Sequence, residues 1–227
     1  MTIQLVVFDM AGTTVNDENA VNRTLRDTLE GFGLAVGFED VNRVMGIPKP
    51  EALRVLIEGT PLGEPLRDRV DAIHDDFVSR MIRFYATDAS VHEVLGTTRT
   101  FEVLRAAGVR VALNSGFSRQ IARIIMDRLG WSVGGRIDAS VTSDEVPRGR
   151  PHPDMIRRLM ADLGVVDPSH VAKVGDTPSD LLEGRNAGCG LVIGVTRGSH
   201  TRQELELFPH THLIDSVADV PAVPGMV

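Results

Sequence analysis

The sequence predicts an α/β protein, in which a doubly wound parallel sheet carries a helical cap inserted after the first strand. Two observations lead to this prediction. Short apolar runs alternate with segments whose apolar residues repeat at helical spacing, which is typical of a parallel sheet with helices on both faces. From about residue 18 to about residue 89 the alternation stops, and only helical patterns remain. We therefore expect a core domain at residues 1–17 and 90–227 and a cap domain at residues 18–89.

Five apolar runs are the candidate strands of the core. The first, at residues 5–8, has no polar position before Asp9, as expected of a strand that is covered on both sides. The others are 109–113, 139–142 (the weakest), 170–174 and 191–195. Helical patterns, each followed by a glycine that suits a helix C-terminus, occupy 100–107, 118–129, 153–163 and 178–187. This order predicts a Rossmann-like core.

The cap segment contains two clear helical patterns, with several prolines between them. Apolar residues recur every three or four positions, as on the buried face of an amphipathic helix. The two sets are Val21, Leu25, Leu29 and Phe32, and then Val70, Ile73, Phe77, Met81 and Phe84. We expect these helices to lie over the carboxyl ends of the strands, with hinges near residues 16–18 and 88–90.

The composition limits the kinds of partner. Of the 227 residues, 24 are Lys or Arg and 31 are Asp or Glu, so the net charge is -7. An acidic chain is a poor general ligand for nucleic acids or anionic membranes. The single cysteine, Cys189, excludes an internal disulfide, and no stretch approaches the roughly 18 apolar residues of a membrane span. Because no positively charged leader precedes the first strand, we expect a cytoplasmic protein that acts on a small molecule.

Polar residues cluster where the predicted strands end. They form four short motifs, which are Asp9–Thr14, Asn114–Gly116, Arg148–Pro153 and Gly175–Asp180. The carboxyl ends of parallel strands meet at one edge of the sheet, where ligands of such folds bind. A lone aspartate after a strand is usually a turn or cap residue. Four such motifs at successive strand ends favour an active site.

The side chains of these motifs suit a phosphoryl group and a divalent cation. Mg²⁺ prefers oxygen ligands, so Asp9, Asp176 and a backbone carbonyl, that of Ala11, are its candidate ligands. The ion would neutralise the phosphoryl oxygens and allow Asp9 to attack phosphorus. The candidates to bind the remaining oxygens are Ser115, the backbone N–H of Gly116 and the guanidinium of Arg150.

The four motifs resemble those of the haloacid dehalogenase superfamily of phosphotransferases. The resemblance covers nearly the whole chain and places the helical insertion where that superfamily carries its first type of cap. It implies Mg²⁺ as the cofactor, an aspartyl-phosphate intermediate on Asp9, and Asp180 behind the metal ligand Asp176. One position departs from the pattern. Ordinary phosphatases of the superfamily have an aspartate that protonates the leaving oxygen where this chain has Ala11.

Several segments resemble the phosphonatase branch of this superfamily in particular. They are Asp9-Met10-Ala11-Gly12-Thr13-Thr14, Met45-Gly46-Ile47-Pro48-Lys49, 149–153 and 183–188. The resemblance implies that Lys49 forms an imine with a small phosphonate aldehyde, which accepts the electrons of the breaking carbon–phosphorus bond. It also implies that Thr13 and Met45 contact the substrate, and it suggests a homodimer formed through the cap. The branch carries a histidine three residues after the lysine, where this chain has Ala52.

Other functions stay open beside this leading interpretation. The first is hydrolysis of a small phosphate monoester, in which Lys49 would be an ordinary exposed lysine that the reaction does not need. The second is an inactive protein that only binds phosphate, which Ala11 favours and the remaining motif residues oppose. Dehalogenation is less compatible, because Asp176 and the threonines of the first motif suit metal-assisted phosphoryl transfer.

Overall fold

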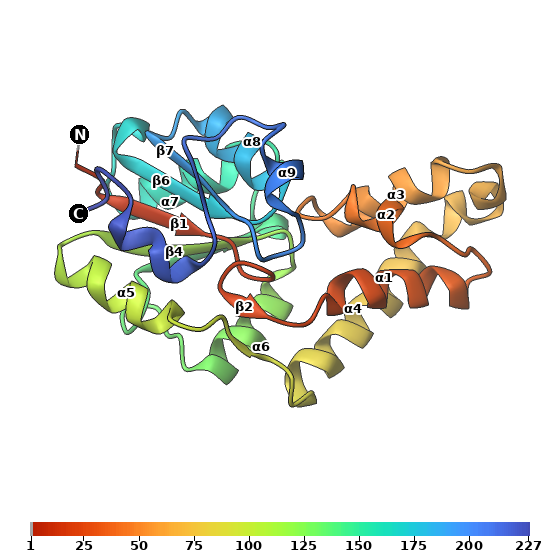
Figure 1. Ribbon diagram of the computed structural model, residues 1–227. Helices are drawn as coiled ribbons and strands as arrows, with labels where there is room; N and C mark the ends of the chain where they lie inside the picture. The colour runs from red at the N-terminus through yellow and green to blue at the C-terminus, as the bar shows by residue number, and fades with distance from the viewer. Residues whose placement is uncertain (1) are drawn as a thin grey trace.

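The computed structural model describes residues 2–227, and it confirms the predicted fold class. Six parallel strands form one sheet in the order β5-β4-β1-β6-β7-β8 (Figure 1). The strands are Leu5–Phe8 (β1), Arg110–Ser115 (β4), Ala139–Thr142 (β5), Val171–Gly175 (β6), Leu191–Val195 (β7) and His212–Ile214 (β8). All five predicted strands are present, and β8 extends the sheet at one edge.

Helices cover both faces of the sheet. Those of the core are α5 (Thr97–Ala106), α6 (Arg119–Leu129), α7 (Asp154–Asp162), α8 (Pro178–Ala187) and α9 (Arg202–Leu205). Successive side chains of a strand point to opposite faces. In β1, Val6 and Phe8 therefore pack in one hydrophobic cluster with α5 and α6, whereas Leu5 and Val7 pack in another with α7. This two-sided burial explains why β1 has no polar position.

The segment between residues 18 and 89 is helical, as the sequence predicts. Its elements are α1 (Ala20–Gly31), α2 (Phe38–Asn42), α3 (Lys49–Glu58), the 3-10 segment η1 (Pro61–Arg69) and α4 (Val70–Thr87). Figure 1 shows α1–α4 gathered to one side of the sheet. In α4 the predicted buried face is shifted by one position at its end, because Tyr85 is fully buried and Phe84 only partly. We call α1–α4 together with the loops between them the cap helices.

The two connections between the cap helices and the sheet lie side by side. β2 (Val15–Asn16) pairs antiparallel with β3 (His92–Glu93). The hydroxyl of Tyr85, in α4, donates a hydrogen bond of 2.6 Å to Asp17, which follows β2. Two-residue strands carry no periodic pattern, so the sequence did not predict this pair.

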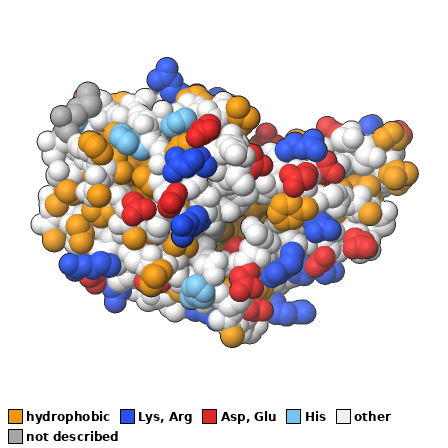
Figure 2. Space-filling view, viewed as in Figure 1, with side chains coloured by type: hydrophobic (Ala, Val, Ile, Leu, Met, Phe, Trp, Pro, Cys, Tyr) orange, Lys and Arg blue, Asp and Glu red, His pale blue; other side chains and the backbone are white. Residues whose placement is uncertain are grey.

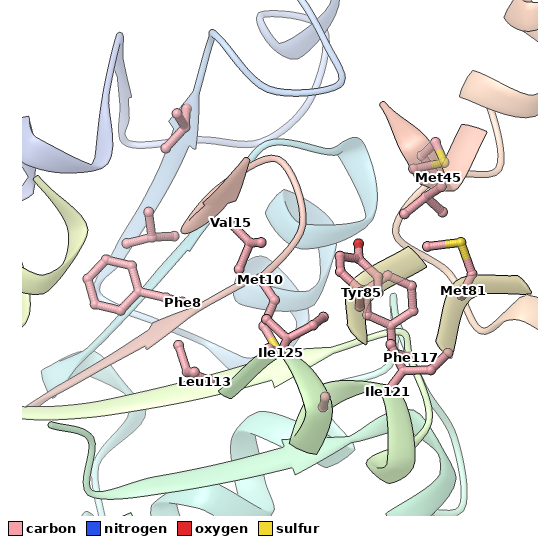
Figure 3. Packing of buried hydrophobic residues seen from close by; sticks show 14 of the residues in the cluster. Phe8, Met10, Val15, Met45, Met81, Tyr85, Leu113, Phe117, Ile121 and Ile125 are labelled. Carbon is pink, nitrogen blue, oxygen red and sulfur yellow. The ribbon is translucent and has the colours of Figure 1, made fainter. Parts of the chain in front are cut away.

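One hydrophobic cluster continues from the cap helices into the core. Figure 3 shows Met81 and Tyr85 of α4 beside Phe117, in the loop after β4, and Ile121 of α6, with Met45 close to them. The rings of Tyr85 and Phe117 pack edge to face with their centroids 5.6 Å apart. The cap helices therefore pack directly against the loop that follows β4.

The outer surface mixes both signs of charge, and Figure 2 shows acidic and basic side chains interspersed over one face. Within residues 2–227 every helix is too short or too polar to cross a membrane. The remaining short 3-10 segments are η2 (Ser143–Glu145), η3 (Pro168–His170) and η4 (Val217–Ala222).

Candidate active site

The strand order places three of the sequence motifs next to one another. β1 lies between β4 and β6, and the chain passes first to the β4 side and then to the β6 side, so the strand order switches at β1. Asp9 follows β1, Ser115 ends β4, and Asp176 follows β6. All three are buried, with at most 5% of each exposed. The structure thus brings these predicted site residues together at the switch point, where ligands of open α/β sheets bind.

Three carboxylates at this edge form a cluster that can hold a metal ion. Asp9, Asp176 and Asp180 each offer an oxygen, and these oxygens all lie within 4.8 Å of one another. Burial, with repulsion from Asp180 and Asp176 and despite Arg150, raises the pKa of Asp9 to about 7. Burial and Asp180 also raise the pKa of Asp176, to about 6. A cluster of buried carboxylate oxygens that repel one another fits a hard divalent cation.

Arg150 connects the loop after β5 to this cluster. Its side chain is 1% exposed, and Nη1 lies 2.7 Å from Asp9 Oδ1 and 2.9 Å from Asp180 Oδ1. Nε pairs with Glu183 at 3.0 Å, and Nη2 donates to the backbone oxygen of Asn114 at 2.9 Å. Although burial opposes ionisation, the surrounding carboxylates raise the pKa of Arg150 further above its usual range. The guanidinium is therefore a fixed cation beside Asp9.

A buried polar network behind Arg150 was missed by the sequence reasoning. Lys173, in the middle of β6, pairs with Asp180 at 2.9 Å and with Glu183 at 3.3 Å. The amide of Asn114 donates to both oxygens of Glu183 at 2.9 Å and accepts from Lys173 at 2.6 Å. A charged residue inside an otherwise apolar buried strand was the signal that could have found Lys173, because an isolated buried charge is costly.

Asp176 is held from both sides by hydrogen bonds. The hydroxyl of Thr13 donates to Oδ1 at 2.8 Å, and the backbone N–H of Ser199 donates to Oδ2 at 2.6 Å. Thr13, a predicted substrate contact, is fully buried and contacts this carboxylate. Thr14 donates to the backbone oxygen of Asp9 at 2.8 Å and so fixes the turn after β1. Both threonines therefore orient the carboxylate loops.

Asp180 lies behind Asp176 on the first turn of α8. Its Oδ2 accepts hydrogen bonds from the hydroxyl and the backbone N–H of Thr177, at 2.5 and 3.2 Å, as in a helix capping box. Its Oδ1 faces Arg150 and Lys173. Despite burial, these two cations hold the pKa of Asp180 below its usual range. Asp180 is thereby fixed as a carboxylate that positions Arg150.

Two glycines bring the loop before α3 down onto this edge of the sheet. Gly46 has a φ of 84°, and a Cβ there would lie 2.3 Å from the Thr177 hydroxyl oxygen. A Cβ on Gly116 would lie 3.0 Å from the backbone oxygen of Gly46. Only glycine permits both the positive φ and this close approach. The short motif from Met45 to Lys49 is therefore pressed against the loops that follow β4 and β6.

Lys49, the first residue of α3, is buried as a result, with 5% exposed. Its Nζ donates to the backbone oxygen of Ile47 at 3.3 Å and lies 5.9 Å from the centre of the Phe117 ring. Burial, supported by Arg150 and opposed by Asp9, lowers the pKa of Lys49 to about 8. The alternative of an ordinary exposed lysine is therefore wrong. At neutral pH a larger fraction of this amine is uncharged than in a free lysine.

Lysine is also rare in this chain, in which only two of the 24 basic residues are lysines, Lys49 and Lys173. Both are buried at this site, and arginine occupies the other basic positions. Arginine cannot lose its proton in a protein, whereas a buried lysine can. The scarcity of lysine was therefore a further signal in the sequence, and it pointed to both Lys49 and Lys173.

A small cavity lies between the core and the loop before α3, and we call it the central cavity. Among the residues that line it are Asp9, Ala11, Ser115, Gly116 and Arg150 from the core, with Met45 and Lys49 from the cap helices. It thus brings a carboxylate, a guanidinium and a lysine amine to one space. Thr13, Asp176 and Asp180 lie behind its wall.

The raised pKa of Asp176 predicts how metal-free stability depends on pH. Its folded value of about 6 exceeds its ordinary value of 3.8, so the group stabilises the folded state below about pH 4, and that contribution is lost as the pH rises through 6. Relative to Asp176→Asn, the unfolding free energy of the wild type should fall by about 2 kcal/mol between pH 4 and pH 7.5. Urea unfolding of both proteins in a chelator measures this difference.

The same pair of proteins tests the metal site. At pH 7.5, added Mg²⁺ should raise the melting temperature of the wild type and raise that of Asp176→Asn far less, since a ligand that binds the folded state stabilises it. Parallel pH curves for the two proteins would show that Asp176 does not carry this buried charge. Equal stabilisation of both proteins by Mg²⁺ would show that Asp176 does not contribute to metal binding.

Comparison with known proteins places this geometry in a family. Residues 3–188 match the haloacid dehalogenase-like hydrolases. The phosphonoacetaldehyde hydrolase of Bacillus cereus is 29% identical over 232 residues, which cover 96% of this chain and 86% of that protein. The phosphonoacetaldehyde hydrolase of Bacillus cytotoxicus is 32% identical over 222 residues, which cover 91% of this chain and 82% of that protein.

Solved structures with the same fold include proteins with different names. A phosphonoacetaldehyde hydrolase-like protein from Oleispira antarctica aligns with a TM-score of 0.84 and 21% identity, covering 98% of this chain and 91% of that one. A predicted phosphoglycolate phosphatase from Haemophilus somnus aligns with a TM-score of 0.81 and 18% identity, covering 97% of each chain. The family match spans most of the sequence, from residue 3 to residue 188, so this chain belongs to the haloacid dehalogenase-like hydrolases.

Proposed function

We propose that this hydrolase cleaves the carbon–phosphorus bond of a small phosphonate aldehyde, with Asp9 as the nucleophile and Lys49 as an imine-forming amine. One observation carries the proposal. The carboxylate of Asp9 and the buried amine of Lys49 line the same central cavity. A phosphatase needs the carboxylate of Asp9. The amine of Lys49 can in addition form an imine, which stabilises the carbanion left when a carbon–phosphorus bond breaks.

The acidic cluster fits Mg²⁺ as the cofactor, with Asp9, Asp176 and the backbone carbonyl of Ala11 as the proposed ligands. When bound, the ion would neutralise charge on the phosphoryl group and reduce its repulsion of Asp9. Arg150 adds a fixed positive charge 2.7 Å from the nucleophile. Ser115 and the backbone of Gly116 also line the cavity and are proposed to bind phosphoryl oxygens.

Lys49 begins the reaction in this proposal. The lone pair of its neutral amine attacks the aldehyde carbon, and loss of water leaves a protonated imine. An oxygen of Asp9 then bonds to phosphorus as the carbon–phosphorus bond breaks. The electron pair of that bond forms a carbon–carbon double bond, and the imine π electrons move to nitrogen to give an enamine. Protonation at carbon and hydrolysis release the aldehyde product and the free amine, and water releases phosphate from Asp9.

The residue at position 11 is consistent with this route. Hydrolysis of a phosphate ester requires protonation of a leaving oxygen, and Ala11 offers no acid for it. In the proposed route the leaving carbon delivers its electrons to the imine, so no acid is needed at that position. The names of the curated relatives point to the same substrate class.

Hydrolysis of a small phosphate monoester is the second candidate function. This candidate is suggested by proteins of similar fold that are described as phosphoglycolate phosphatases, such as those from Haemophilus somnus and Lactobacillus delbrueckii. In that function Asp9, Arg150 and the metal site would act as above, but the amine of Lys49 would form no covalent bond. The two candidates therefore differ in one observable, the imine.

Borohydride trapping decides between the two candidates. The protein is incubated with phosphonoacetaldehyde and Mg²⁺, reduced, and analysed by intact mass and peptide mapping. The chain has two lysines, so the amines to be distinguished are Lys49, Lys173 and the α-amino group. A single adduct on Lys49 together with release of phosphate would support phosphonate cleavage. Intact substrate with no adduct on Lys49 would exclude it.

The lowered pKa of Lys49 predicts the pH dependence of imine formation. Only the neutral amine attacks, so the initial rate should rise about tenfold per pH unit up to the pKa of about 8 and level off above it. The rate of reductive trapping of acetaldehyde on Lys49 between pH 6 and pH 10 measures this. Arg54→Lys supplies a matched reference amine, because position 54 is exposed on the same helix. If Lys49 and the amine introduced by this substitution are labelled with the same pH profile, the amine of Lys49 is not activated by burial.

A further inference from the structure

A second cavity, of about 140 Å³, lies beside Lys49 between the cap helices and the core, and we call it the side chamber. Lys49 and Phe117 line both the side chamber and the central cavity, so the lysine amine stands at the junction of the two spaces. The other walls include Pro48, Phe77 and Ile121, which are apolar, and His74 of α4. The side chamber therefore holds a lysine and a histidine in a mostly apolar setting.

Imine chemistry at Lys49 needs a group that carries protons. Nζ must lose a proton when it adds to the aldehyde, and the carbinolamine hydroxyl must gain one before it leaves as water. A group that performs both transfers has a pKa near the working pH and is within reach of the amine. Histidine is the side chain whose ordinary pKa best meets this requirement.

The titratable side chains that line the side chamber are Lys49, His74 and Asp144. Asp144 is engaged elsewhere, since it accepts hydrogen bonds from the backbone N–H of Arg119 at 3.0 Å and from the hydroxyl of Thr142 at 2.6 Å. His74 is half-buried on the α4 wall. It is thus the group in this chamber that is free to exchange a proton.

Resting on the proposed function, we propose that His74 carries protons for the amine of Lys49. Neutral imidazole accepts the proton that Nζ releases as its lone pair bonds to the aldehyde carbon. The imidazolium returns that proton to the carbinolamine hydroxyl, which departs as water while the nitrogen lone pair forms the C=N bond. After the carbon–phosphorus bond breaks, the ring takes up a proton from solvent water and delivers it to the enamine carbon, which restores the protonated imine.

The charges around His74 are compatible with this role. Burial lowers the pKa of His74 below 6.5, and the charge of Lys49, in α3, lowers it further. Asp75 and Asp71, on α4 itself, act in the opposite direction. Asp144 faces the chamber from η2. The ring is therefore mostly neutral at pH 7, the form that accepts a proton from Nζ.

The test compares two substrates in the whole enzyme. Phosphonoacetaldehyde requires the imine, whereas acetyl phosphate reports only phosphoryl transfer to Asp9. His74→Gln should lower kcat for phosphonoacetaldehyde by about 10²-fold and leave acetyl phosphate hydrolysis within about twofold of the wild type. Free imidazole should restore turnover to His74→Ala. His210→Gln, a matched change at an exposed histidine near the C-terminus, should alter neither activity.

Each other outcome overturns a specific claim. Undiminished phosphonoacetaldehyde turnover in both His74 variants would remove the proton-transfer role and leave the proposed function intact. Equal losses on both substrates, with no rescue by imidazole, would make His74 a structural residue. If the wild type cleaves acetyl phosphate but neither cleaves phosphonoacetaldehyde nor gives an adduct on Lys49, the proposed function fails, and the role of His74 fails with it.

Discussion

Replacement of Asp9 by asparagine is expected to lower phosphate release from phosphonoacetaldehyde by at least about 10³-fold while imine formation on Lys49 continues. The amide is close in shape to the carboxylate, but it is a far weaker nucleophile toward phosphorus. Lys49 lines the same cavity and is not removed by the change. The imine should therefore form and accumulate on Lys49, because the carbon–phosphorus bond does not break.

The mass of the trapped adduct measures this result directly. Reduction of the wild-type reaction should give a Lys49 adduct from which phosphorus has been lost, whereas Asp9→Asn should give an adduct heavier by one phosphoryl group. The fold is expected to persist, since burial raises the pKa of Asp9 to about 7 and the substitution removes a charge that is costly to bury. A phosphorus-free adduct in Asp9→Asn would mean that another group accepts the phosphoryl group.

Replacement of Lys49 by methionine is expected to abolish phosphonoacetaldehyde turnover and to spare hydrolysis of acetyl phosphate. Methionine has a similar length and suits the buried position, but it has no amine. Without the imine, the electrons of the carbon–phosphorus bond have no acceptor. Because imine formation is an all-or-none requirement of the route, the loss should reach at least about 10³-fold in kcat/KM.

Lys49→Arg separates the amine from its charge. Arginine keeps a positive charge at the junction of the two cavities, but it cannot lose a proton at accessible pH. It should therefore be as inactive toward phosphonoacetaldehyde as the methionine variant. Both variants are assayed for phosphate release and for borohydride adducts. Substantial phosphonoacetaldehyde activity in Lys49→Arg would show that charge, and not covalent chemistry, is what Lys49 supplies.

Much of the fold was predictable because it depends on local patterns. An apolar run such as 5–8 can be stable only where both faces of a strand are covered, and the hydrophobic clusters on the two sides of β1 confirm this. The glycines after the helices, and the polar residues that stop each strand, are likewise local signals. They were sufficient to place Asp9, Ser115 and Asp176 at one edge of the sheet, because parallel strands share their direction.

Other features depend on contacts between distant segments and left no periodic signal. The pairing of β2 with β3 joins Asn16 to His92, which are 76 positions apart, through two-residue strands. The hydrogen bond that Thr13 donates to Asp176 was equally hidden, because it joins residues 163 positions apart in the chain. Contacts of this kind form only when whole helices and strands pack together.

The sequence by itself determined the parallel α/β core, the helical insertion and the set of strand-end side chains, since each follows from burial periodicity or from the chemistry of a short motif. Only the tertiary structure decided that Lys49 is buried in the same cavity as Asp9, that Asp180 and Glu183 hold Arg150, and that His74 shares a chamber with the lysine. The physical reason is that burial and charge–charge energies depend on distances between segments far apart in the chain. Those distances are fixed when the cap helices pack against the loops after β4 and β6.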